Sequence, residues 1–199
     1  MPISIKLIRL TAILPLVTLA GGCSSTMPPQ AAPASPTASV LTEYQAAPAA
    51  AKRETSSPPP SIVKRLLETK ECPKCDLEGA DLKGANLEGA DLTDADLEGA
   101  NLESANLRKA DLEEADLERA SLQGADLTDA DLEDASLNRA NLSRANLSQA
   151  ELDGAILDRA NLSQANLNQA DLERANLNAA SLEGTNFQGA TMPDGTIRK

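Results

Sequence analysis

A five-residue period between Cys75 and Asp194 constrains the fold of this chain more than any other feature of its sequence. The unit follows roughly the pattern A-[D/N]-L-x-x, and 24 such units succeed one another without a gap. Leucine fills the central position of every unit except the last two, which have Phe187 and Met192. Alanine lies two residues before the centre, with Cys75 and Thr185 as exceptions. So short and regular a repeat has to be interpreted as a whole before local secondary structure is assigned.

Neither regular secondary structure accommodates this period. In an α-helix a five-residue step turns each leucine by roughly 140° about the axis, so the leucines do not form a stripe. In a flat strand an odd step sends successive leucines to opposite faces. A chain that turns by about a right angle in each unit does place every leucine on one axis, with the alanines on the same inner side. The sequence therefore predicts an all-β solenoid of about six square coils, stacked about 4.8 Å apart.

The array resembles the pentapeptide-repeat family over its whole length. The resemblance implies a right-handed quadrilateral β-helix. The departures from the family pattern are Ile156 where a polar residue is usual, Thr185 for alanine, and Phe187 and Met192 for leucine. We expect the larger apolar groups near the end to close the core in a final coil. The lead-in Cys72-Pro-Lys-Cys-Asp-Leu and the ending Met192-Pro-Asp-Gly-Thr are similar to those of bacterial, especially cyanobacterial, members.

Residues 1–22 have the pattern of a secretory signal of the lipoprotein type. Lys6 and Arg9 give a positive start, and the apolar run over residues 10–20 is shorter than the about 20 residues that a membrane span needs. The segment Leu19-Ala-Gly-Gly-Cys23 resembles a bacterial lipobox, although its leucine lies one residue further from the cysteine than is usual. We expect lipidation of Cys23 and export to the periplasmic or lumenal side of a bacterial membrane. An ordinary signal peptide and a retained anchor are the alternatives.

Two segments separate the signal from the array at residues 75–194. Residues 23–60 are rich in Ala, Pro, Ser and Thr, a composition that cannot bury a core and favours a disordered tether. Residues 61–74 contain the best helix candidate after the signal, with Ser61 as N-cap and apolar i, i+4 pairs, followed by the CxxC lead-in. Because the end of a solenoid exposes its core, we expect a capping helix here rather than a linker extension. The array is followed by a tail at residues 195–199, and we expect Pro193-Asp-Gly-Thr-Ile197 to form a turn that covers the other end.

The segment Cys72-Pro-Lys-Cys75 has the spacing of a metal or redox motif. Zinc usually takes four Cys or His ligands, and this chain has three cysteines and no histidine. A thioredoxin-like role needs a βαβ setting, which the sequence lacks. Cys75 takes the inward alanine position of the first unit, which favours a packing role. If Cys23 is lipidated, the other two cysteines form an even pair outside the reducing cytoplasm and then suit a local disulfide.

Residues 20 apart share one wall of the predicted solenoid, and one wall is strongly acidic. The chain has 30 acidic and 18 basic residues and a formal net charge of −12. The predicted acidic interaction face consists of Asp91, Asp94, Asp111, Glu113, Glu114, Asp131, Glu133, Asp134, Glu151, Asp153, Asp171 and Glu173. Arg174 is the one base expected there. Another wall stacks Asn86, Asn106, Asp126, Asn146, Asn166 and Asn186, which favours an amide ladder.

Stacked carboxylates repel one another unless cations or a basic partner screen them. A merely hydrated surface, a protein partner of basic charge and a divalent-cation-responsive scaffold all fit this face. The resemblance implies a further alternative, because some pentapeptide-repeat proteins resemble DNA and inhibit topoisomerases through such faces. Export would keep this domain away from such a cytoplasmic enzyme. We do not expect nucleic acid itself as a partner.

The sequence shows no catalytic constellation. It has no histidine base, no set of zinc ligands and no glycine-rich phosphate loop, and a filled rod offers no natural cavity. We therefore expect no enzyme activity, no cofactor and no metal. The chain should be a membrane-tethered, rigid structural or protein-interaction module.

Overall fold

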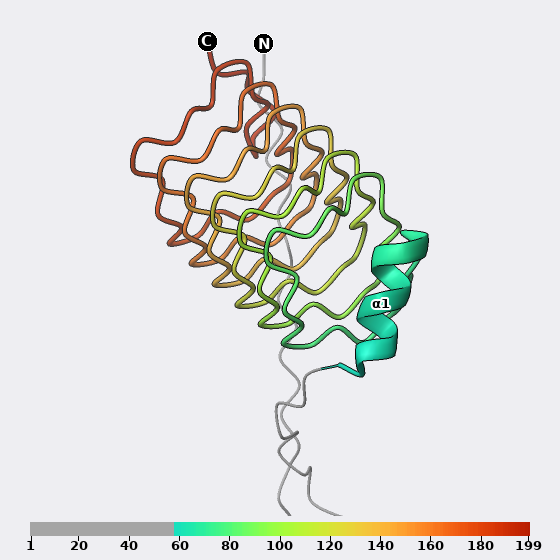
Figure 1. Ribbon diagram of the computed structural model, residues 1–199. Coiled ribbons are helices and arrows are strands. Elements are labelled where there is room, and N and C mark those ends of the chain that lie inside the picture. Colours follow the sequence, from blue (N-terminus) through green and yellow to red (C-terminus); the bar gives the residue numbers. More distant parts are fainter. Residues whose placement is uncertain (1–57) are drawn as a thin grey trace, which may run out of the picture. The chain divides into compact units, whose positions relative to one another are not determined.

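A computed structural model of the chain describes residues 58–199 (Figure 1). The predicted signal peptide, Cys23 and nearly all of the predicted tether lie outside these residues, so those expectations stay predictions. Within the described range no helix has the length and apolar character that a membrane crossing requires.

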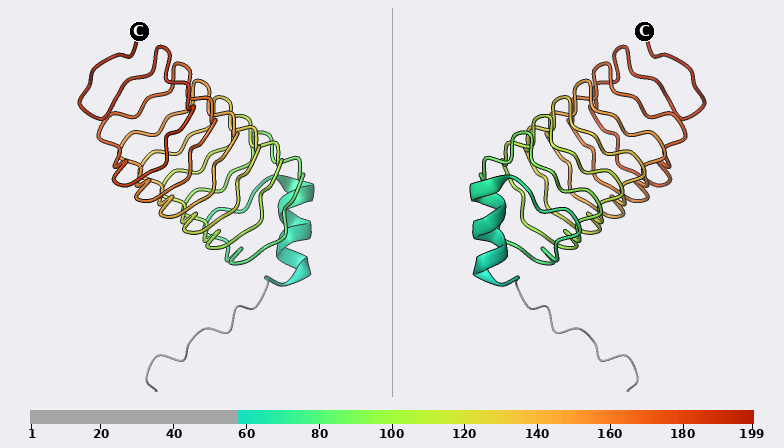
Figure 2. Two further views of the ribbon diagram at one scale, coloured as in Figure 1. Left: turned by 90° about the vertical axis from the view of Figure 1, so that its left-hand side faces the viewer. Right: turned by 90° about the vertical axis from the view of Figure 1, so that its right-hand side faces the viewer.

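The described chain winds into square coils that lie one above another (Figures 1 and 2). Parallel β-bridges join residues 20 positions apart, from Glu71 with Asp91 at one end of the series to Asp171 with Thr191 at the other. All the bridges of residues 58–199 are isolated, so this part of the chain contains no longer strand. Since the bridged residues are 20 apart and the unit has five residues, four units make one coil.

A repeated set of backbone hydrogen bonds holds each unit to the neighbouring coils. In the middle of the stack the Leu97 N–H donates to the Asp116 carbonyl at 2.7 Å, and the Gly99 N–H donates to the Glu118 carbonyl at 2.8 Å. In the opposite direction the Asp116 N–H donates to the Ala95 carbonyl at 2.9 Å. These bonds satisfy the polar backbone groups of a chain that has little regular secondary structure.

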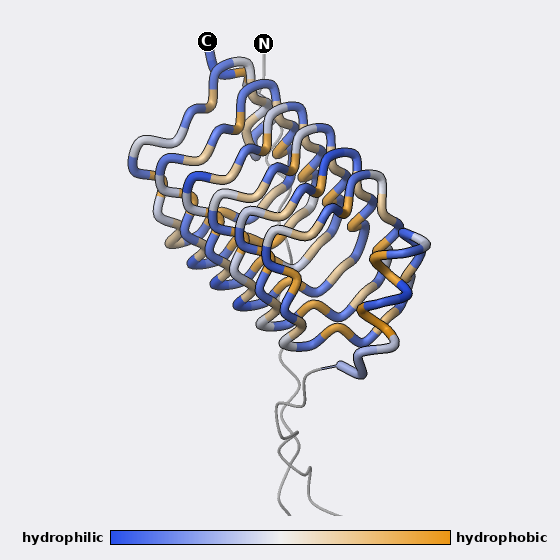
Figure 3. The backbone as a smooth tube through the Cα atoms, in the orientation of Figure 1, coloured by the Kyte–Doolittle hydropathy of each residue, from blue (hydrophilic) through white to orange (hydrophobic). Residues whose placement is uncertain are grey.

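The interior is filled by the two inward positions of the unit. The central leucines from Leu77 to Leu172 are at most 2% exposed, and the alanines between them are buried almost without exception. Figure 3 shows apolar and polar residues alternating along each coil. Burying a leucine side chain stabilises a fold by about 2 kcal/mol. The stacked leucines therefore provide the main stabilisation of a rod that has no other core.

The corners of the coils are tight turns that follow the central leucine. At one corner the Ala100 N–H donates to the Leu97 carbonyl at 3.0 Å, and Gly99 within the turn has a φ of 64°. A positive φ at the third residue is the property of a type II turn. Glycine is absent from many equivalent positions, where Arg119 and Arg139, for example, have φ values of 57° and 58°. The pairing between coils therefore imposes the left-handed conformation on residues that do not prefer it.

The helix of the described chain, α1 (Pro60–Thr69), lies across the first coil (Figure 2). Pro59 is its N-cap and no side chain caps it, so the prediction of Ser61 as the N-cap is wrong. Proline suits the first turn of a helix, because the N–H that it lacks would have no partner inside the helix. Leu66 is completely buried in the core, whereas Leu67 on the adjoining face is 43% exposed.

The coiled array begins one unit before the predicted boundary at Cys75. Lys70 ends α1 in a left-handed conformation, and its carbonyl accepts a hydrogen bond from the Asp91 N–H at 2.8 Å. The Cys72 N–H in turn donates to the Asp91 carbonyl at 2.9 Å. Residues 70–74 are therefore a complete unit, and not a simple lead-in as predicted. The unit is hidden in the sequence because Lys70 stands in the alanine position and Cys72 in the leucine position.

The last coil leaves the core open, so the prediction that its larger apolar groups close it is wrong. Leu182 is 39% exposed, and Leu177 and Phe187 are only partly buried. A coil in the middle of the stack has neighbours on both sides, whereas the apolar groups of this coil have a covering coil on one side only.

The C-terminal tail folds back along one edge of that coil. The Met192 N–H donates to the Thr196 carbonyl at 2.7 Å, and Thr191 pairs with Ile197 through an antiparallel bridge. The Ile197 side chain nevertheless remains 68% exposed. The predicted turn is therefore present, but the tail pairs with one wall and does not cover the leucine row.

Candidate interaction surface

The residues of the predicted acidic face lie together on one wall, which is called the acidic wall below. It consists of Asp91, Asp94, Asp111, Glu113, Glu114, Asp131, Glu133, Asp134, Glu151, Asp153, Asp171 and Glu173. Parallel bridges connect Asp111 with Asp131 and Asp131 with Glu151. The Glu114 N–H donates to the Glu133 carbonyl of the next coil at 2.9 Å. The backbone therefore stacks these acidic positions in columns along the rod.

Two further charged residues belong to the acidic wall and were not predicted from the sequence. Glu71 starts the column that continues with Asp91, to which it is bridged. Lys74 adds a base, because its Nζ lies 2.9 Å from Oδ2 of Asp94. Both belong to the hidden unit at residues 70–74. Glu71 and Lys74 lie 20 residues before Asp91 and Asp94, so the coil spacing predicts their place on this wall once the array is extended by one unit.

The backbone fixes the orientation of the carboxylates that precede the central leucines. Oδ1 of Asp111 accepts a hydrogen bond from the Glu113 N–H at 3.2 Å, and Oδ1 of Asp131 accepts one from the Glu133 N–H at 3.0 Å. Asp residues commonly form such bonds to the backbone two residues ahead. The carboxylates are therefore preorganised on the wall, which lowers the entropy cost of a contact with a partner.

Crowding of like charges is strongest around Glu113. Loss of hydration raises the pKa of its carboxyl above the ordinary value, and the charges of Asp131, Asp111, Glu133 and Glu114 raise it further. A raised carboxyl pKa means that the folded chain disfavours the ionised form. A positive group at this point of the acidic wall would remove that repulsion.

Bases relieve the repulsion at the two ends of the acidic wall. A hydrogen bond from Lys74 lowers the pKa of the Asp94 carboxyl, although partial loss of hydration opposes it. Arg174 does the same for the pKa of Asp153, and its Nε donates to Oδ1 of that residue at 2.7 Å. The pKa of Arg174 is raised in turn, first by its hydrogen bond with Asp153 and then by the charge of that carboxylate. Glu113, near the middle of the wall, forms no ion pair with a base of residues 58–199.

A shallow groove lies at one edge of the acidic wall. It has a volume of about 400 Å³ and is lined by Glu133, Gln149, Ala150, Glu151, Asp153, Gln169 and Asp171. Its lining combines carboxylates of the acidic wall with the amides of Gln149 and Gln169, which belong to the wall that precedes it along the chain. Arg174 already pairs with Asp153 and lies 3.9 Å from Glu133, so a basic side chain in this groove would meet chiefly Glu151 and Asp171. Among residues 58–199 no group of three or more Cys, Asp or Glu side chains has the arrangement of a metal site.

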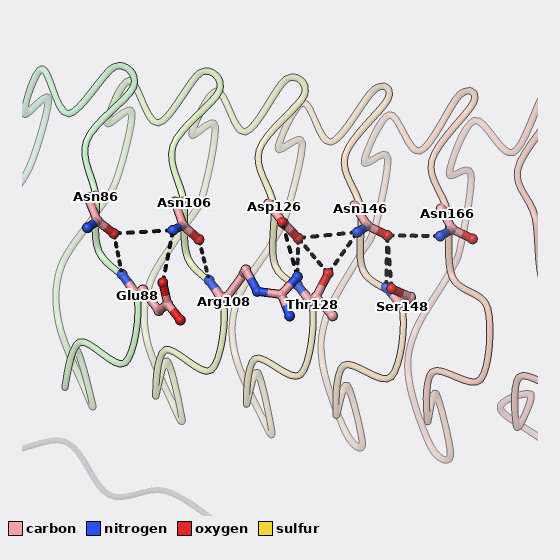
Figure 4. A network of polar contacts seen from close by, with 9 residues as sticks. All are labelled: Asn86, Glu88, Asn106, Arg108, Asp126, Thr128, Asn146, Ser148 and Asn166. Carbon is pink, nitrogen blue, oxygen red and sulfur yellow. Dashed lines mark hydrogen bonds and ion pairs between the residues drawn. The ribbon is translucent and has the colours of Figure 1, made fainter.

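The neighbouring wall has a different chemistry, with a ladder of side-chain amides (Figure 4). The Asn106 Nδ2 donates to Oδ1 of Asn86 at 3.2 Å, and the Asn166 Nδ2 donates to Oδ1 of Asn146 at 2.8 Å. The ladder continues with Asn186, whose Nδ2 donates to Oδ1 of Asn166 at 3.0 Å. This wall is nearly neutral, because it carries about as many basic as acidic side chains, so it contrasts with the acidic wall beside it.

Asp126 interrupts the amide ladder, because a carboxylate cannot donate to the coil before it. Partial burial acts to raise its pKa, but hydrogen bonds from the Thr128 hydroxyl and backbone N–H and the charge of Arg108 lower it overall. The Asn146 Nδ2 still donates to Oδ1 of Asp126 at 3.2 Å. The ladder therefore resumes on the far side of the carboxylate (Figure 4).

Cys72 and Cys75, considered above as a pair, are joined by a disulfide with their Cα atoms 5.3 Å apart. Cys72 is completely buried and Cys75 is 6% exposed. Both side chains belong to the core at the first coil. Cys23, the predicted lipidation site, lies outside the described residues.

The array matches a family model described as pentapeptide repeats, with 8 copies over residues 74–108, 95–134, 125–164 and 155–192. The chain belongs to the pentapeptide-repeat family. Proteins of this family are generally structural or interaction proteins and not enzymes. No curated protein matches the chain.

Solved structures of pentapeptide-repeat proteins are similar to this chain. HetL from the cyanobacterium Nostoc sp. strain PCC 7120, a protein involved in heterocyst differentiation regulation, is 33% identical over 64% of this chain and 76% of HetL, with a TM-score of 0.36. Rfr23 from the cyanobacterium Cyanothece 51142 is 31% identical over 63% of this chain and 92% of its own, with a TM-score of 0.43. QnrB1, a plasmid-mediated fluoroquinolone resistance protein, is 19% identical over 61% of this chain and 65% of its own, with a TM-score of 0.57. The family match and the similarity to QnrB1 support the right-handed quadrilateral β-helix as the fold.

Proposed function

We propose that this pentapeptide-repeat protein is a non-enzymatic, rigid interaction module whose acidic wall binds a protein partner of basic charge. The observation that carries the proposal is the column of Asp91, Asp111, Asp131 and Glu151, which parallel bridges place on successive coils. Neighbouring carboxylates in such a column repel one another at the coil spacing of about 4.8 Å. Basic groups of a partner would turn this repulsion into attraction.

Three properties of the acidic wall support protein recognition over a merely hydrated surface. Its carboxylates are oriented by backbone hydrogen bonds, as at Asp111 and Asp131. Its charge is uncompensated around Glu113, whose pKa is raised. A groove of about 400 Å³ runs along its edge, where an arginine or lysine side chain of the partner would fit. A rigid, preorganised surface of one charge favours fast and salt-sensitive association with a basic partner.

We propose further that a lipid at Cys23 tethers the module to a bacterial membrane on its periplasmic or lumenal side. The sequence pattern around Cys23 and the composition of residues 24–60 support this placement. A Cys23→Ala variant, expressed in a bacterial host, should move from the membrane fraction to the soluble fraction and lose its lipid by intact-protein mass spectrometry. An unlipidated wild-type chain in the cytoplasmic fraction would overturn the tether.

Site-specific photocrosslinking in the native host tests the interaction. A photoreactive residue at Glu113 should give a crosslinked adduct with a basic protein, whereas the same residue at Ser143, on the opposite wall, should not. The triple variant Asp91→Asn, Asp111→Asn, Asp131→Asn should abolish the adduct. The matched control is Asp76→Asn, Asp96→Asn, Asp116→Asn, which makes the same chemical change at equivalent positions of the adjoining wall. Equal loss of crosslinking in the two triple variants would contradict a role for the acidic wall.

The same variants separate two alternative functions. A DNA-mimic inhibitor would block a topoisomerase in a supercoiling assay, and the acidic-wall variant would lose that inhibition while the control variant kept it. A cation-responsive scaffold would show a rise in melting temperature with millimolar calcium, which would disappear when Asp111, Asp131 and Glu151 are replaced by their amides. Neither effect is expected if the acidic wall serves a basic protein.

A further inference from the structure

The first corner of the array contains two sulfur atoms where other corners have leucine and alanine. In a standard corner the central leucine and the alanine three residues later both point inward, as Leu77 and Ala80 do, and both are buried. Cys72 and Cys75 occupy the same two places, and the Cys75 N–H donates to the Cys72 carbonyl at 3.3 Å as in the other corners. The disulfide is therefore a covalent substitute for a Leu–Ala packing contact.

A guanidinium from α1 lies directly on this disulfide. Nη2 of Arg65 donates to Sγ of Cys75 at 2.8 Å and lies 3.4 Å from Sγ of Cys72. The disulfide sulfurs are neutral and accept hydrogen bonds only weakly, so this contact contributes little to the oxidised form. A thiolate in the same place would accept a charge-assisted hydrogen bond, which is considerably stronger. Arg65 is thus placed where it favours the reduced form.

We propose that Cys72 and Cys75 form a reducible redox site, and that Arg65 is a positioning residue which makes the disulfide easier to reduce. The substrate that would reduce the disulfide is either a protein with two thiols or a small-molecule thiol. A stabilised reduced form makes a disulfide more oxidising, since the equilibrium depends on the difference between the two forms. The site differs from the acidic wall in its residues and its chemistry, so the inference does not depend on the proposed function.

The exposure of the two cysteine residues determines the order of the exchange that we propose. Cys75 is 6% exposed and Cys72 is completely buried, so the incoming thiolate attacks Sγ of Cys75. A mixed disulfide forms at Cys75, the bond to Cys72 breaks, and its electron pair leaves with Cys72 as a thiolate beside Arg65. The second thiol of the reductant then attacks the mixed disulfide and releases Cys75. Two electrons and two protons pass to the cysteines, and the reductant leaves as a disulfide.

A redox titration of the full chain tests the role of Arg65. Cys23→Ser is present in every sample, so that only the Cys72–Cys75 pair titrates. The fraction of disulfide at equilibrium with defined mixtures of reduced and oxidised dithiothreitol is measured by thiol alkylation and mass spectrometry. Replacing Arg65 by leucine should lower the equilibrium constant for reduction about tenfold, because the lost bond is to a charged acceptor. Arg65→Lys should recover part of the loss.

Lys64→Leu is the matched control, because it removes one positive charge from the same helix at an exposed position. It should leave the equilibrium constant within about twofold of the wild-type value. Circular dichroism should show that the oxidised variants have the same fold. An Arg65→Leu variant that titrates like the wild type would overturn the proposal. So would a wild-type disulfide that stays oxidised until the protein unfolds.

A second measurement does not depend on the equilibrium. The Cys72→Ser variant leaves Cys75 as a free thiol beside Arg65, and its rate of alkylation by iodoacetamide reports the thiolate fraction. Adding Arg65→Leu should slow the reaction near pH 7 by about tenfold, whereas adding Lys64→Leu should not. Equal rates with and without Arg65 would contradict the proposal even if the reduced pair proved unstable.

Discussion

Asp111 and Asp131 are paired by a parallel β-bridge although a whole coil of the chain separates them. The pairing places two carboxylates on successive coils, next to Glu113 and Glu133. A wall built in this way gathers negative charge from distant parts of the sequence, and we expect this charge to lower the stability of the fold.

Replacing Glu113 by glutamine should raise the melting temperature near pH 7. The pKa of Glu113 is raised in the folded chain, first by loss of hydration and then by nearby carboxylates, so its ionised form destabilises the fold. As the pH falls through that raised pKa the carboxyl takes up a proton, and the advantage of the variant should vanish. Calorimetry at a series of pH values measures both effects.

The control for this experiment is Glu103→Gln on another wall. Glu103 occupies the equivalent position of its unit, but Oε2 lies 2.6 Å from Nζ of Lys83. This variant loses an ion pair, so its melting temperature should stay the same or fall. A rise of equal size in both variants would mean that the crowding around Glu113 is not the cause.

Replacing Leu127 by alanine should destabilise the array by about 2 to 5 kcal/mol, the usual range for a buried leucine. Leu127 is completely buried, with coils on both sides. Leu182→Ala in the last coil should cost clearly less, because that side chain is already 39% exposed. Denaturant titration followed by circular dichroism compares the two. Leu127→Asp should collapse the local stack, and unchanged melting of that variant would contradict the axial leucine row.

Replacing Arg139 by glycine should stabilise the protein by about 1 kcal/mol, since the left-handed conformation costs a residue with a side chain roughly that much. Arg139 has a φ of 58° at a corner of its coil. Asn138→Gly, one residue earlier and not at a positive φ, should instead lower the melting temperature, because glycine adds entropy to the unfolded chain. The melting temperature should be higher for Arg139→Gly than for Asn138→Gly, and the reverse order would contradict a cost of the left-handed conformation at Arg139.

Backbone amides of the last coil should exchange with deuterium much faster than their counterparts one coil earlier. The Leu157 N–H donates to the Asn176 carbonyl at 2.8 Å, and the Leu162 N–H donates to the Ser181 carbonyl at 2.9 Å. The equivalent amides of Leu177 and Leu182 have no hydrogen-bond partner among residues 58–199. Exchange followed by mass spectrometry should show the contrast. Equal protection of the amides in these two coils would indicate that another chain covers the open coil.

The sequence was sufficient for the coiled fold and for the part of the acidic wall between Asp91 and Glu173, because both depend on the strict period of the unit and of the coil. It was insufficient at the ends, where the period weakens. Lys70 and Cys72 conceal a complete unit, and Glu71 and Lys74 were therefore missed as members of the acidic wall. Phe187 seemed large enough to close the core, but bulk cannot replace a covering coil.

Local conformations were also beyond prediction from single residues. Arg139 has no intrinsic preference for a positive φ, and only the hydrogen bonds between coils explain why it adopts one. The Arg65 contact with the disulfide likewise depends on how α1 lies over the first coil, which no pattern in the sequence specifies.

Residues 20 positions apart lie on the same wall, so the number of residues between two positions determines whether their side chains face the same direction. Deleting residues 115–134 would shorten the rod by one turn of the spiral and leave the negative stripe aligned from end to end. Deleting only residues 115–119 would rotate everything downstream by a quarter turn, so that Asp131 and its successors would face a different direction from Asp111. An insertion or deletion therefore keeps the residues of each wall aligned only if it adds or removes whole coils of 20 residues.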